Sequence, residues 1–320
     1  MKVIIAGLGS IGQRHARNLR HLGVTSLFGV DPDEKRQQFF AKEFDADTFS
    51  DVSEAASKGA ELAVIASPNR FHIEQALICA KANCHLFIEK PLGTSLEDVD
   101  ELIKLIESKK LFAHVGSNWK FQIAFRKMRE LIEKGCLGSV TGVQVLAGQW
   151  LPDWHPHEDY RQGYSARRDL GGGIVLDSHE IDCITWLLGD VTDIQGFSAR
   201  SGRLEVETED VACASLRMAS GALGTVHIDY IQRKPARRYT ISGDGGSLEW
   251  DLYSESVKLH QAGVDQVEVI PTPLGDVNGM YVEQMRHVLD GLAGKTAPVT
   301  SLKSARRTLE LQLYLRDQID

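Results

Sequence analysis

Few cysteines, no long apolar segment and no excess of positive charge limit what this chain can be. Its five cysteines form no Cys-x-x-Cys pair, which predicts reduced thiols and neither a disulfide framework nor a metal site. No apolar run approaches the roughly 20 residues of a membrane-spanning helix. The formal net charge of -8 argues against nucleic acid or a membrane surface as a partner. These absences favour a soluble cytoplasmic protein.

The length of the chain and its pattern predict two domains. At 320 residues it exceeds one typical core. Strands and helices alternate as far as the apolar run that ends near residue 118, whereas strand-like runs separated by Gly, Asp and Pro follow residue 190. We therefore expect a first domain at residues 1–119 and a second at residues 120–320. A strand pattern begins at residue 2, so we expect no signal peptide.

Three glycines in G-x-G-x-x-G spacing lie between the apolar run at residues 2–6 and a helical pattern at residues 11–22. In this context one glycine makes a turn, the next lets a pyrophosphate approach the backbone, and the third lets helix and strand pack closely. The free N–H groups at the helix start would face the phosphates. The residues that we expect to contact a dinucleotide here are Gly7, Gly9, Ser10, Ile11 and Gly12.

The second predicted strand, "TSLFGVD", ends in Asp31, 19 residues beyond Gly12. An acid at this place holds the adenosine ribose hydroxyls, and its charge would repel a 2'-phosphate. The position therefore favours NAD over NADP. The alternative is that Asp31 is only a turn residue before Pro32.

Polar residues follow the later strands of the first domain. Ligands of parallel sheets lie beyond the carboxyl ends of the strands, so these residues extend the predicted cofactor site. They are Ser67, Pro68, Asn69, His72, Glu89, Lys90 and Asn118. A charged amphipathic helix should begin at Ser95, where Ser95 and Asp98 can form a capping box.

Several of these segments together resemble the glucose–fructose oxidoreductase / inositol dehydrogenase (Gfo/Idh/MocA) family. They are "GLGSIGQRH", "SPNRFHIEQAL", "EKPLGTSLEDVDEL", "VGSNWKFQIAFRKMRELIEKGCLGSV", "LGGGIVLDSHEIDCITWLLG" and "YVEQMRHVLDGLAGKTAPVTSLKSARRTLEL". The resemblance implies a Rossmann domain with a doubly wound parallel sheet. It also implies a second domain with a large, mostly antiparallel open sheet and flanking helices. The chain is further expected to form a homo-oligomer, either a dimer or a tetramer. Family members mostly oxidise or reduce a hydroxyl of a sugar, inositol or related molecule.

The resemblance assigns Lys90 and His179 to catalysis. The lysine of the family's EKP motif lies beside the nicotinamide, where its ammonium can stabilise alkoxide character. The family's histidine takes the hydroxyl proton, and Asp182, three residues on, can orient its ring on a helix. The alternatives are a surface lysine at a strand end and a helix histidine bonded to a nearby carbonyl.

Asp177 departs from the family pattern, because the catalytic aspartate usually precedes the histidine by four residues and here precedes it by two. On a regular helix this spacing puts the two side chains on nearly opposite faces. Either the segment is distorted, so that Asp177 still enters the site, or Asp177 is an N-cap whose capping box is completed by Glu180.

A long polar and aromatic segment at residues 151–169 is expected to contact the substrate, since long loops in compact domains are often functional. Aromatic rings could stack on a sugar and arginines could bind an anionic group. The alternative is an ordered surface loop. The candidate residues here and nearby are Lys120, Trp154, Tyr160, Arg161, Tyr164, Arg167 and Arg168. His155 and His157 lack a further ligand at metal spacing, so we expect no metal.

These features predict an NAD-dependent oxidoreductase acting on a hydroxyl or keto carbon of a sugar, nucleotide sugar or cyclitol, with or without an anionic group. The loop and the compact "DSHEID" segment resemble a branch associated with bacterial surface-sugar synthesis. Two alternatives remain. One is a non-catalytic NAD-binding regulator, and the other is an enzyme of the epimerase or glycosidase type that recycles NAD as an internal oxidant.

Overall fold

The chain divides into two units in the computed structural model, which describes residues 1–154 and 159–318. The first unit comprises Met1–Asn118 and Asn278–Leu309. The second comprises residues 119–277 and the chain from Glu310 onward. Each unit is therefore built from two separate stretches of sequence.

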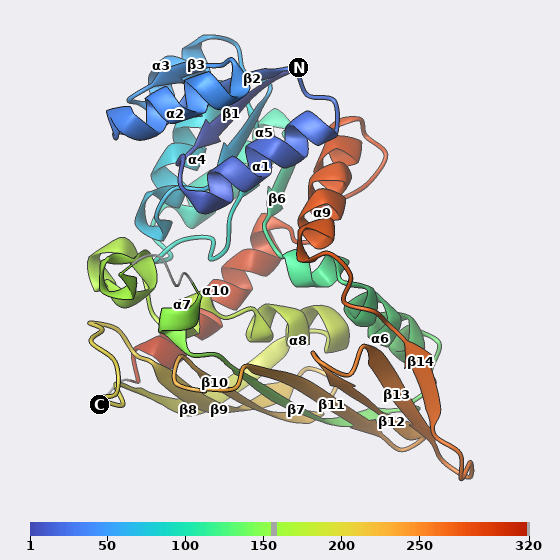
Figure 1. Cartoon of the computed structure of the whole chain (residues 1–320). Coiled ribbons are helices and arrows are strands. Elements are labelled where there is room, and N and C mark those ends of the chain that lie inside the picture. Colours follow the sequence, from blue (N-terminus) through green and yellow to red (C-terminus); the bar gives the residue numbers. More distant parts are fainter. Residues whose placement is uncertain (155–158, 319–320) are drawn as a thin grey trace. The chain divides into compact units, whose positions relative to one another are not determined.

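The first unit contains a parallel six-stranded sheet of order β3-β2-β1-β4-β5-β6 (Figure 1). This order confirms the predicted Rossmann fold. The apolar runs of β1 and β4 are buried because they lie in the middle of the sheet. The strands are β1 (Lys2–Ala6), β2 (Ser26–Val30), β3 (Asp47–Phe49), β4 (Leu62–Ile65), β5 (His85–Ile88) and β6 (Ala113–Val115).

Helices alternate with these strands. They are α1 (Ser10–His21), α2 (Glu34–Phe44), α3 (Val52–Ser57), the 3₁₀ turn η1 (Asn69–Phe71), α4 (His72–Lys81) and α5 (Val99–Lys109). The expected start of α5 at Ser95 is wrong. Asp98 precedes the helix with a left-handed φ of 59° and makes no side-chain cap, so no capping box forms there.

Two helices near the end of the sequence were expected in the second domain, α9 (Val277–Leu292) and α10 (Leu302–Arg316). Residues 278–309 instead belong to the first unit. Met285 and Val288 of α9 are fully buried in one apolar cluster with Val3, Ile5 and Phe87. This packing is the physical reason for the correction to the expected boundary.

The second unit contains an eight-stranded sheet of order β14-β13-β12-β11-β7-β10-β9-β8. Strands β7 and β10 run parallel, and the other neighbouring pairs run antiparallel, which confirms the mostly antiparallel sheet. The strands are β7 (Val140–Gly148), β8 (Val191–Ala199), β9 (Val211–Met218), β10 (Leu223–Asp229), β11 (Ala236–Gly243), β12 (Gly246–Asp251), β13 (Ser256–Gln261) and β14 (Glu268–Pro271).

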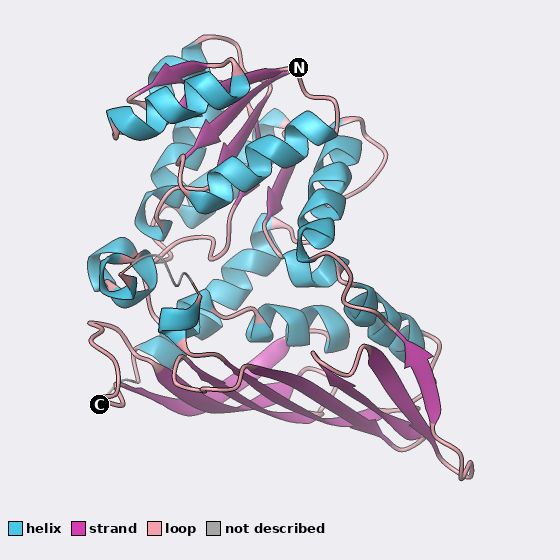
Figure 2. Ribbon diagram, in the orientation of Figure 1, coloured by secondary structure: helices cyan, strands magenta, loops and turns pink. Residues whose placement is uncertain are grey.

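The helices of the second unit that the structure describes lie on one face of this sheet (Figure 2). Alternate residues of β9 point into that face and are buried, whereas those between them are exposed or partly exposed. The helices and turns are η2 (Asn118–Phe121), α6 (Ile123–Glu133), η3 (Leu151–Asp153), η4 (Tyr160–Gln162), η5 (Tyr164–Ala166), η6 (Arg168–Leu170), α7 (Ile174–Asp177) and α8 (Glu180–Leu188). Within the described residues, no helix is long and apolar enough to cross a bilayer.

Candidate active site

The glycine loop between β1 and α1 has the geometry that a pyrophosphate needs. Gly7 has a φ of +91°, and a Cβ there would lie 2.5 Å from the carbonyl oxygen of Ala66. A Cβ at Gly12 would lie 1.9 Å from the carbonyl oxygen of Gly7, whereas one at Gly9 would meet nothing within 4 Å. Gly7 therefore makes the turn, Gly12 allows helix and strand to touch, and Gly9 leaves open space in front of the loop.

The start of α1 is suited to an anion. Its N-cap is Gly9, which has no side chain to cap the helix, and its first turn contains no acidic residue. The first amide groups of a helix, here including Ser10 and Ile11, have no carbonyl partner within the helix. Their N–H groups and the positive end of the helix dipole can bind a phosphate.

Asp31 directly follows β2 and is almost completely buried. Its Oδ2 accepts the main-chain N–H of Leu8 in the glycine loop at 2.9 Å, and its Oδ1 accepts that of Asp33 at 3.0 Å. The guanidinium of Arg36 lies 3.5 Å from Oδ2. Asp31 therefore stabilises the turn and also presents a carboxylate beside the glycine loop.

His72 connects the loops that follow β4 and β5. Its Nδ1 lies 2.8 Å from the carbonyl oxygen of Pro91, and its Nε2 lies 2.9 Å from that of Ser67. Burial lowers the pKa of His72 although both carbonyls oppose this shift. The Oγ of Ser67 donates to Gln75 at 2.7 Å. His72 and Ser67 thus fix the shape of the predicted cofactor loops, and Asn69 between them is buried.

A buried partner of Glu89 was missed from the sequence. The Nε2 of His15 lies 2.6 Å from Glu89 Oε1, and Glu89 Oε2 accepts the main-chain N–H of Lys90 at 3.1 Å. Burial raises the pKa of Glu89, but the hydrogen bond from His15 and the charges of His15 and Lys90 outweigh it and hold this pKa below its ordinary value. His15 follows Gly12 by three residues and so lies on the same side of α1. This spacing was the feature of the sequence from which His15 could have been predicted to lie near the strand ends.

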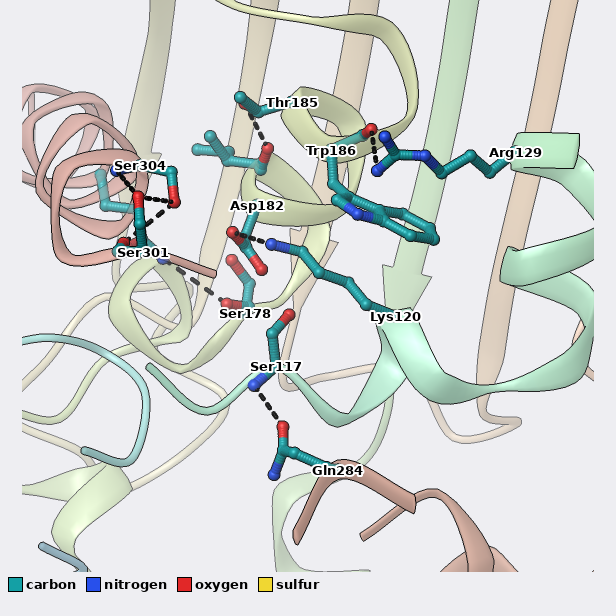
Figure 3. A network of polar contacts seen from close by, with 12 residues as sticks. Ser117, Lys120, Arg129, Ser178, Asp182, Thr185, Trp186, Gln284, Ser301 and Ser304 are labelled. Carbon is teal, nitrogen blue, oxygen red and sulfur yellow. Dashed lines mark hydrogen bonds and ion pairs between the residues drawn. The ribbon is translucent and has the colours of Figure 1, made fainter. Parts of the chain in front are cut away.

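Helix α9 holds the loop after β6. Gln284 Oε1 accepts the main-chain N–H of Ser117 at 2.6 Å (Figure 3), and Asn118 Nδ2 donates to Met280 Sδ at 3.1 Å. Asn118, which we expect at the cofactor, is therefore positioned by a helix that lies about 160 residues later in the sequence.

In the second unit, the segment around Asp177 is not one continuous helix. α7 ends at Asp177, Ser178 is extended with φ -68° and ψ 155°, and His179 precedes α8 without a side-chain cap. The interpretation of Asp177 as an N-cap completed by Glu180 is therefore wrong, and the segment is distorted. Glu180 Oε2 instead accepts the main-chain N–H of His179 at 2.8 Å.

Three hydroxyl groups surround the carboxylate of Asp177. Tyr164 donates to Oδ1, while Ser165 and Tyr230 donate to Oδ2, each at 2.6 Å. Asp177 and Tyr230 are buried, and Tyr164 is 38% exposed. Burial, followed by the charge of Asp177, raises the pKa of Tyr230 well above its ordinary value. These three hydrogen bonds join residues 164 and 165, and the residue that follows β10, to the end of α7.

Lys120 and Asp182 form a nearly buried ion pair. Lys120 Nζ donates to Asp182 Oδ1 at 2.7 Å (Figure 3). Lys120 was expected to reach the substrate and Asp182 to orient His179. Each charge is compensated by the other. Asp182 lies on the first turn of α8, three residues after His179, whereas Lys120 comes from η2.

Two arginines of the 151–169 segment are paired with nearby acids, and a third binds a main-chain carbonyl. Arg161 Nε donates to Asp159 at 2.7 Å, and Arg167 donates to Asp169 at 2.6 Å. Arg168 donates to the carbonyl oxygen of Glu207 at 3.3 Å. These contacts reduce the positive charge that was expected to attract an anionic group.

The aromatic residues of the same segment contact their own unit. The ring of Trp154 meets that of Tyr230 edge-on with centroids 5.3 Å apart, and the hydroxyl oxygen of Tyr160 accepts the main-chain N–H of Glu205 at 3.2 Å. His155 and His157 lie outside the described residues. In the described part of the chain, no group of three or more His, Cys, Asp or Glu side chains is arranged to hold a metal.

Comparisons with known proteins match both units. Residues 1–117 match the model of an oxidoreductase family with an NAD-binding Rossmann fold, and residues 125–249 match the model of the GFO/IDH/MocA C-terminal domain. Myo-inositol 2-dehydrogenase of Thermotoga maritima is 28% identical over 236 residues, 71% of this chain and 67% of that protein. The 2,7-anhydro-N-acetylneuraminate hydratase of Escherichia coli is 25% identical over 268 residues, 81% of this chain and 70% of that protein.

The fold is also that of solved structures. Levoglucosan dehydrogenase in complex with NADH and levoglucosan superposes with a TM-score of 0.88 at 18% identity, covering 99% of this chain and 96% of that chain. This likeness supports the fold of both units.

Proposed function

Because the chain belongs to the GFO/IDH/MocA oxidoreductase family, we propose that it is an NAD-dependent dehydrogenase acting on a CH–OH group. Its substrate is a sugar, nucleotide sugar or cyclitol. The observation that carries the proposal is Lys90, held by the buried pair of Glu89 and His15 after β5, in the same unit as the glycine loop. A protein that only senses NAD needs no such lysine.

The named relatives support this substrate class. One is a myo-inositol dehydrogenase, and the superposed structure contains levoglucosan. Both compounds are neutral polyols with several secondary hydroxyls. The pairing of Arg161 and Arg167 with acids favours a neutral substrate over an anionic one. More narrowly, we propose that the substrate is a sugar used in the synthesis of bacterial surface sugars.

Each candidate residue has a separate role in the proposed reaction. A bound nicotinamide supplies the hydride acceptor. The ammonium of Lys90 donates to the substrate oxygen and stabilises its developing negative charge. The imidazole of His179 takes the hydroxyl proton. Asp182 on the first turn of α8 and Lys120 of η2 carry compensating charges, and Asp177 fixes the end of α7 through the three hydroxyl groups bound to its carboxylate.

We propose that the cofactor is NAD in preference to NADP. Asp31 is held at the edge of the glycine loop by Leu8 and Asp33, where its charge opposes a 2'-phosphate. Arg36 offsets part of that charge, so a preference and not an exclusion is expected. Titration of the protein with each cofactor measures it, and equal or tighter NADP binding would contradict the assignment.

We also propose a cytoplasmic homo-oligomer, dimer or tetramer, that pairs through the open face of the eight-stranded sheet. Phe197 of β8 is 73% exposed and Leu223 of β10 is 54% exposed. Large apolar side chains on a sheet surface favour association. Light scattering of the purified protein measures the mass of the particle in solution. A monomer at micromolar concentration would contradict the proposed homo-oligomer.

One observation favours a second function. The Escherichia coli relative is named a hydratase, and hydration involves no net oxidation. In this alternative, NAD is reduced and reoxidised within each turnover. Both functions require hydride transfer, and they differ in whether NADH accumulates.

A panel of cyclitols, sugars, anhydrosugars and nucleotide sugars tests the proposal. Each compound is incubated with protein and NAD+, and both NADH and the carbohydrate products are followed. We expect NADH to accumulate with at least one polyol. A product without accumulated NADH would indicate the second function, and NAD binding without any turnover would indicate a regulator.

A further inference from the structure

Three side chains form a closed set of contacts around His179. Glu180 is 1% exposed, and while its Oε2 accepts the main-chain N–H of His179 at 2.8 Å, its Oε1 lies 2.8 Å from Arg237 Nε. The guanidinium carbon of Arg237 lies 4.1 Å from the centroid of the Trp119 ring. That ring meets the imidazole of His179 edge-on, with centroids 6.4 Å apart and planes at 67°. The contacts therefore begin and end at His179.

The three residues come from separate elements of the second unit: η2, α8 and β11. Trp119 is anchored in the core, because its ring also packs against the rings of Phe125 and Trp250. The distances between ring centroids are 5.7 Å and 6.1 Å. A buried ion pair such as Glu180–Arg237 gains little net stability, since both groups lose their hydration. The contact is an ion pair without a directional hydrogen bond, so the role of Arg237 is to offset the buried charge of Glu180 and to contact the face of the Trp119 ring.

Four charged groups surround this part of α8. They are Lys120 from η2, Glu180 and Asp182 from α8, and Arg237 from β11, and they form two ion pairs. All four act on the thiol of Cys183, whose pKa is raised first by burial and then by the two carboxylates, against the two cations. These four charges therefore cancel in two pairs, and loss of any one group leaves a net charge at this end of α8.

We propose that Glu180, Arg237 and Trp119 are positioning residues for His179. Glu180 fixes the main chain of residue 179, Trp119 limits the tilt of the imidazole, and Arg237 joins the two while offsetting the charge of Glu180. The proposal rests on the proposed function, in which His179 accepts the hydroxyl proton. It explains why Glu180, which forms no capping box, is a buried carboxylate beside a candidate base.

Charge-neutral variants test the proposal through the imidazole itself. Glu180→Gln keeps an acceptor for the N–H of His179 but removes the negative charge, so the pKa of His179 should fall. Arg237→Gln removes the positive charge, so that pKa should rise. For a single charge close to an imidazole, each shift should be about 0.5 to 1 unit. The double variant should return close to the wild-type value.

The measurement is a pH titration of the histidine Cε1 signals by NMR, with His179 assigned from the signal missing in His179→Asn. Arg238→Gln is the matched control, because Arg238 is the next residue on β11 and pairs with Asp251 on the exposed side. It should leave the pKa of His179 unchanged. Arg237→Gln leaves a buried carboxylate unpaired, so the double variant and Glu180→Gln keep the test valid if that single variant is unstable.

Shifts of opposite sign in the two single variants support the proposal, as does a fall in Glu180→Gln with recovery in the double variant. Shifts of the same sign, or no larger than in Arg238→Gln, would overturn it. The titration needs no substrate. Opposite shifts in a protein that turns over no polyol would therefore retain the positioning role and reject the proposed function.

Discussion

Single residues differ in how much of their role the sequence reveals. Lys90 and Asp31 lie next to strand ends and motifs, so local spacing was enough to single them out. Asp177 was misjudged in one of two interpretations, because its partner Tyr230 comes from a distant segment of the sequence. His15, Arg237 and Gln284 were missed for the same reason.

Glu209 offers a prediction at this scale. It is 2% exposed, and burial raises its pKa to about 7 against the hydrogen bond from the main-chain N–H of Val175 and the charges of Arg168 and Arg316. Its folded pKa exceeds its unfolded pKa, so the stability linked to its proton is complete below the unfolded value. That stability is lost as pH rises through about 7. The full effect is about 3 kcal/mol.

Glu209→Gln should remove this dependence while keeping an acceptor for Val175. Denaturant unfolding at about pH 5 and about pH 8 measures it. We expect the wild type to lose more unfolding free energy between these two conditions than the variant does. Glu205→Gln, a change at an exposed acid of the same segment, should behave like the wild type. Equal losses in wild type and Glu209→Gln would contradict the raised pKa.

Secondary-structure elements were predictable where the pattern is repeated. The alternation of apolar runs and amphipathic helices specified the parallel sheet, and turn residues separated most strands of the second sheet. The assignment of α9 to the second domain was wrong, because an amphipathic pattern indicates that a helix packs and does not indicate against what. The break between α7 and α8 depends on the extended Ser178, which local propensity does not specify.

The glycine loop and α1 carry a prediction at the scale of elements. Gly9 has open space where a Cβ would lie, whereas a Cβ at Gly12 would overlap the backbone of Gly7. Gly9→Ala should therefore leave the melting temperature nearly unchanged while weakening NAD+ binding at least about tenfold, because the methyl group occupies the place of the pyrophosphate. Gly12→Ala should destabilise the fold by about 1 to 3 kcal/mol.

Calorimetric titration with NAD+ and thermal unfolding together separate these two effects. The two alanine variants serve as controls for each other, because they make the same chemical change three residues apart. Full NAD+ affinity in Gly9→Ala would contradict the placement of the cofactor at this loop.

For the whole molecule, the sequence predicted two folds in the correct order but not how the chain is shared between them. Each unit contains a segment that returns from a distant part of the sequence. Such an exchange depends on which apolar surfaces remain to be covered after the sheets form. The candidate cofactor residues were predicted from motifs, whereas the contacts around His179 became visible only in the structure.

The most direct test of the account asks whether hydride leaves a polyol for the cofactor and whether Lys90 is required. A single turnover with stoichiometric NAD+ and a compound selected from the panel, followed by the absorbance of NADH, detects hydride transfer even if NADH is later reoxidised. We predict a transient or lasting NADH signal in the wild type and in Lys35→Ala, an exposed-lysine control. Lys90→Ala should bind NAD+ normally and give no signal. Product formation without any NADH signal in the wild type, or a normal signal in a folded Lys90→Ala variant, would contradict the account.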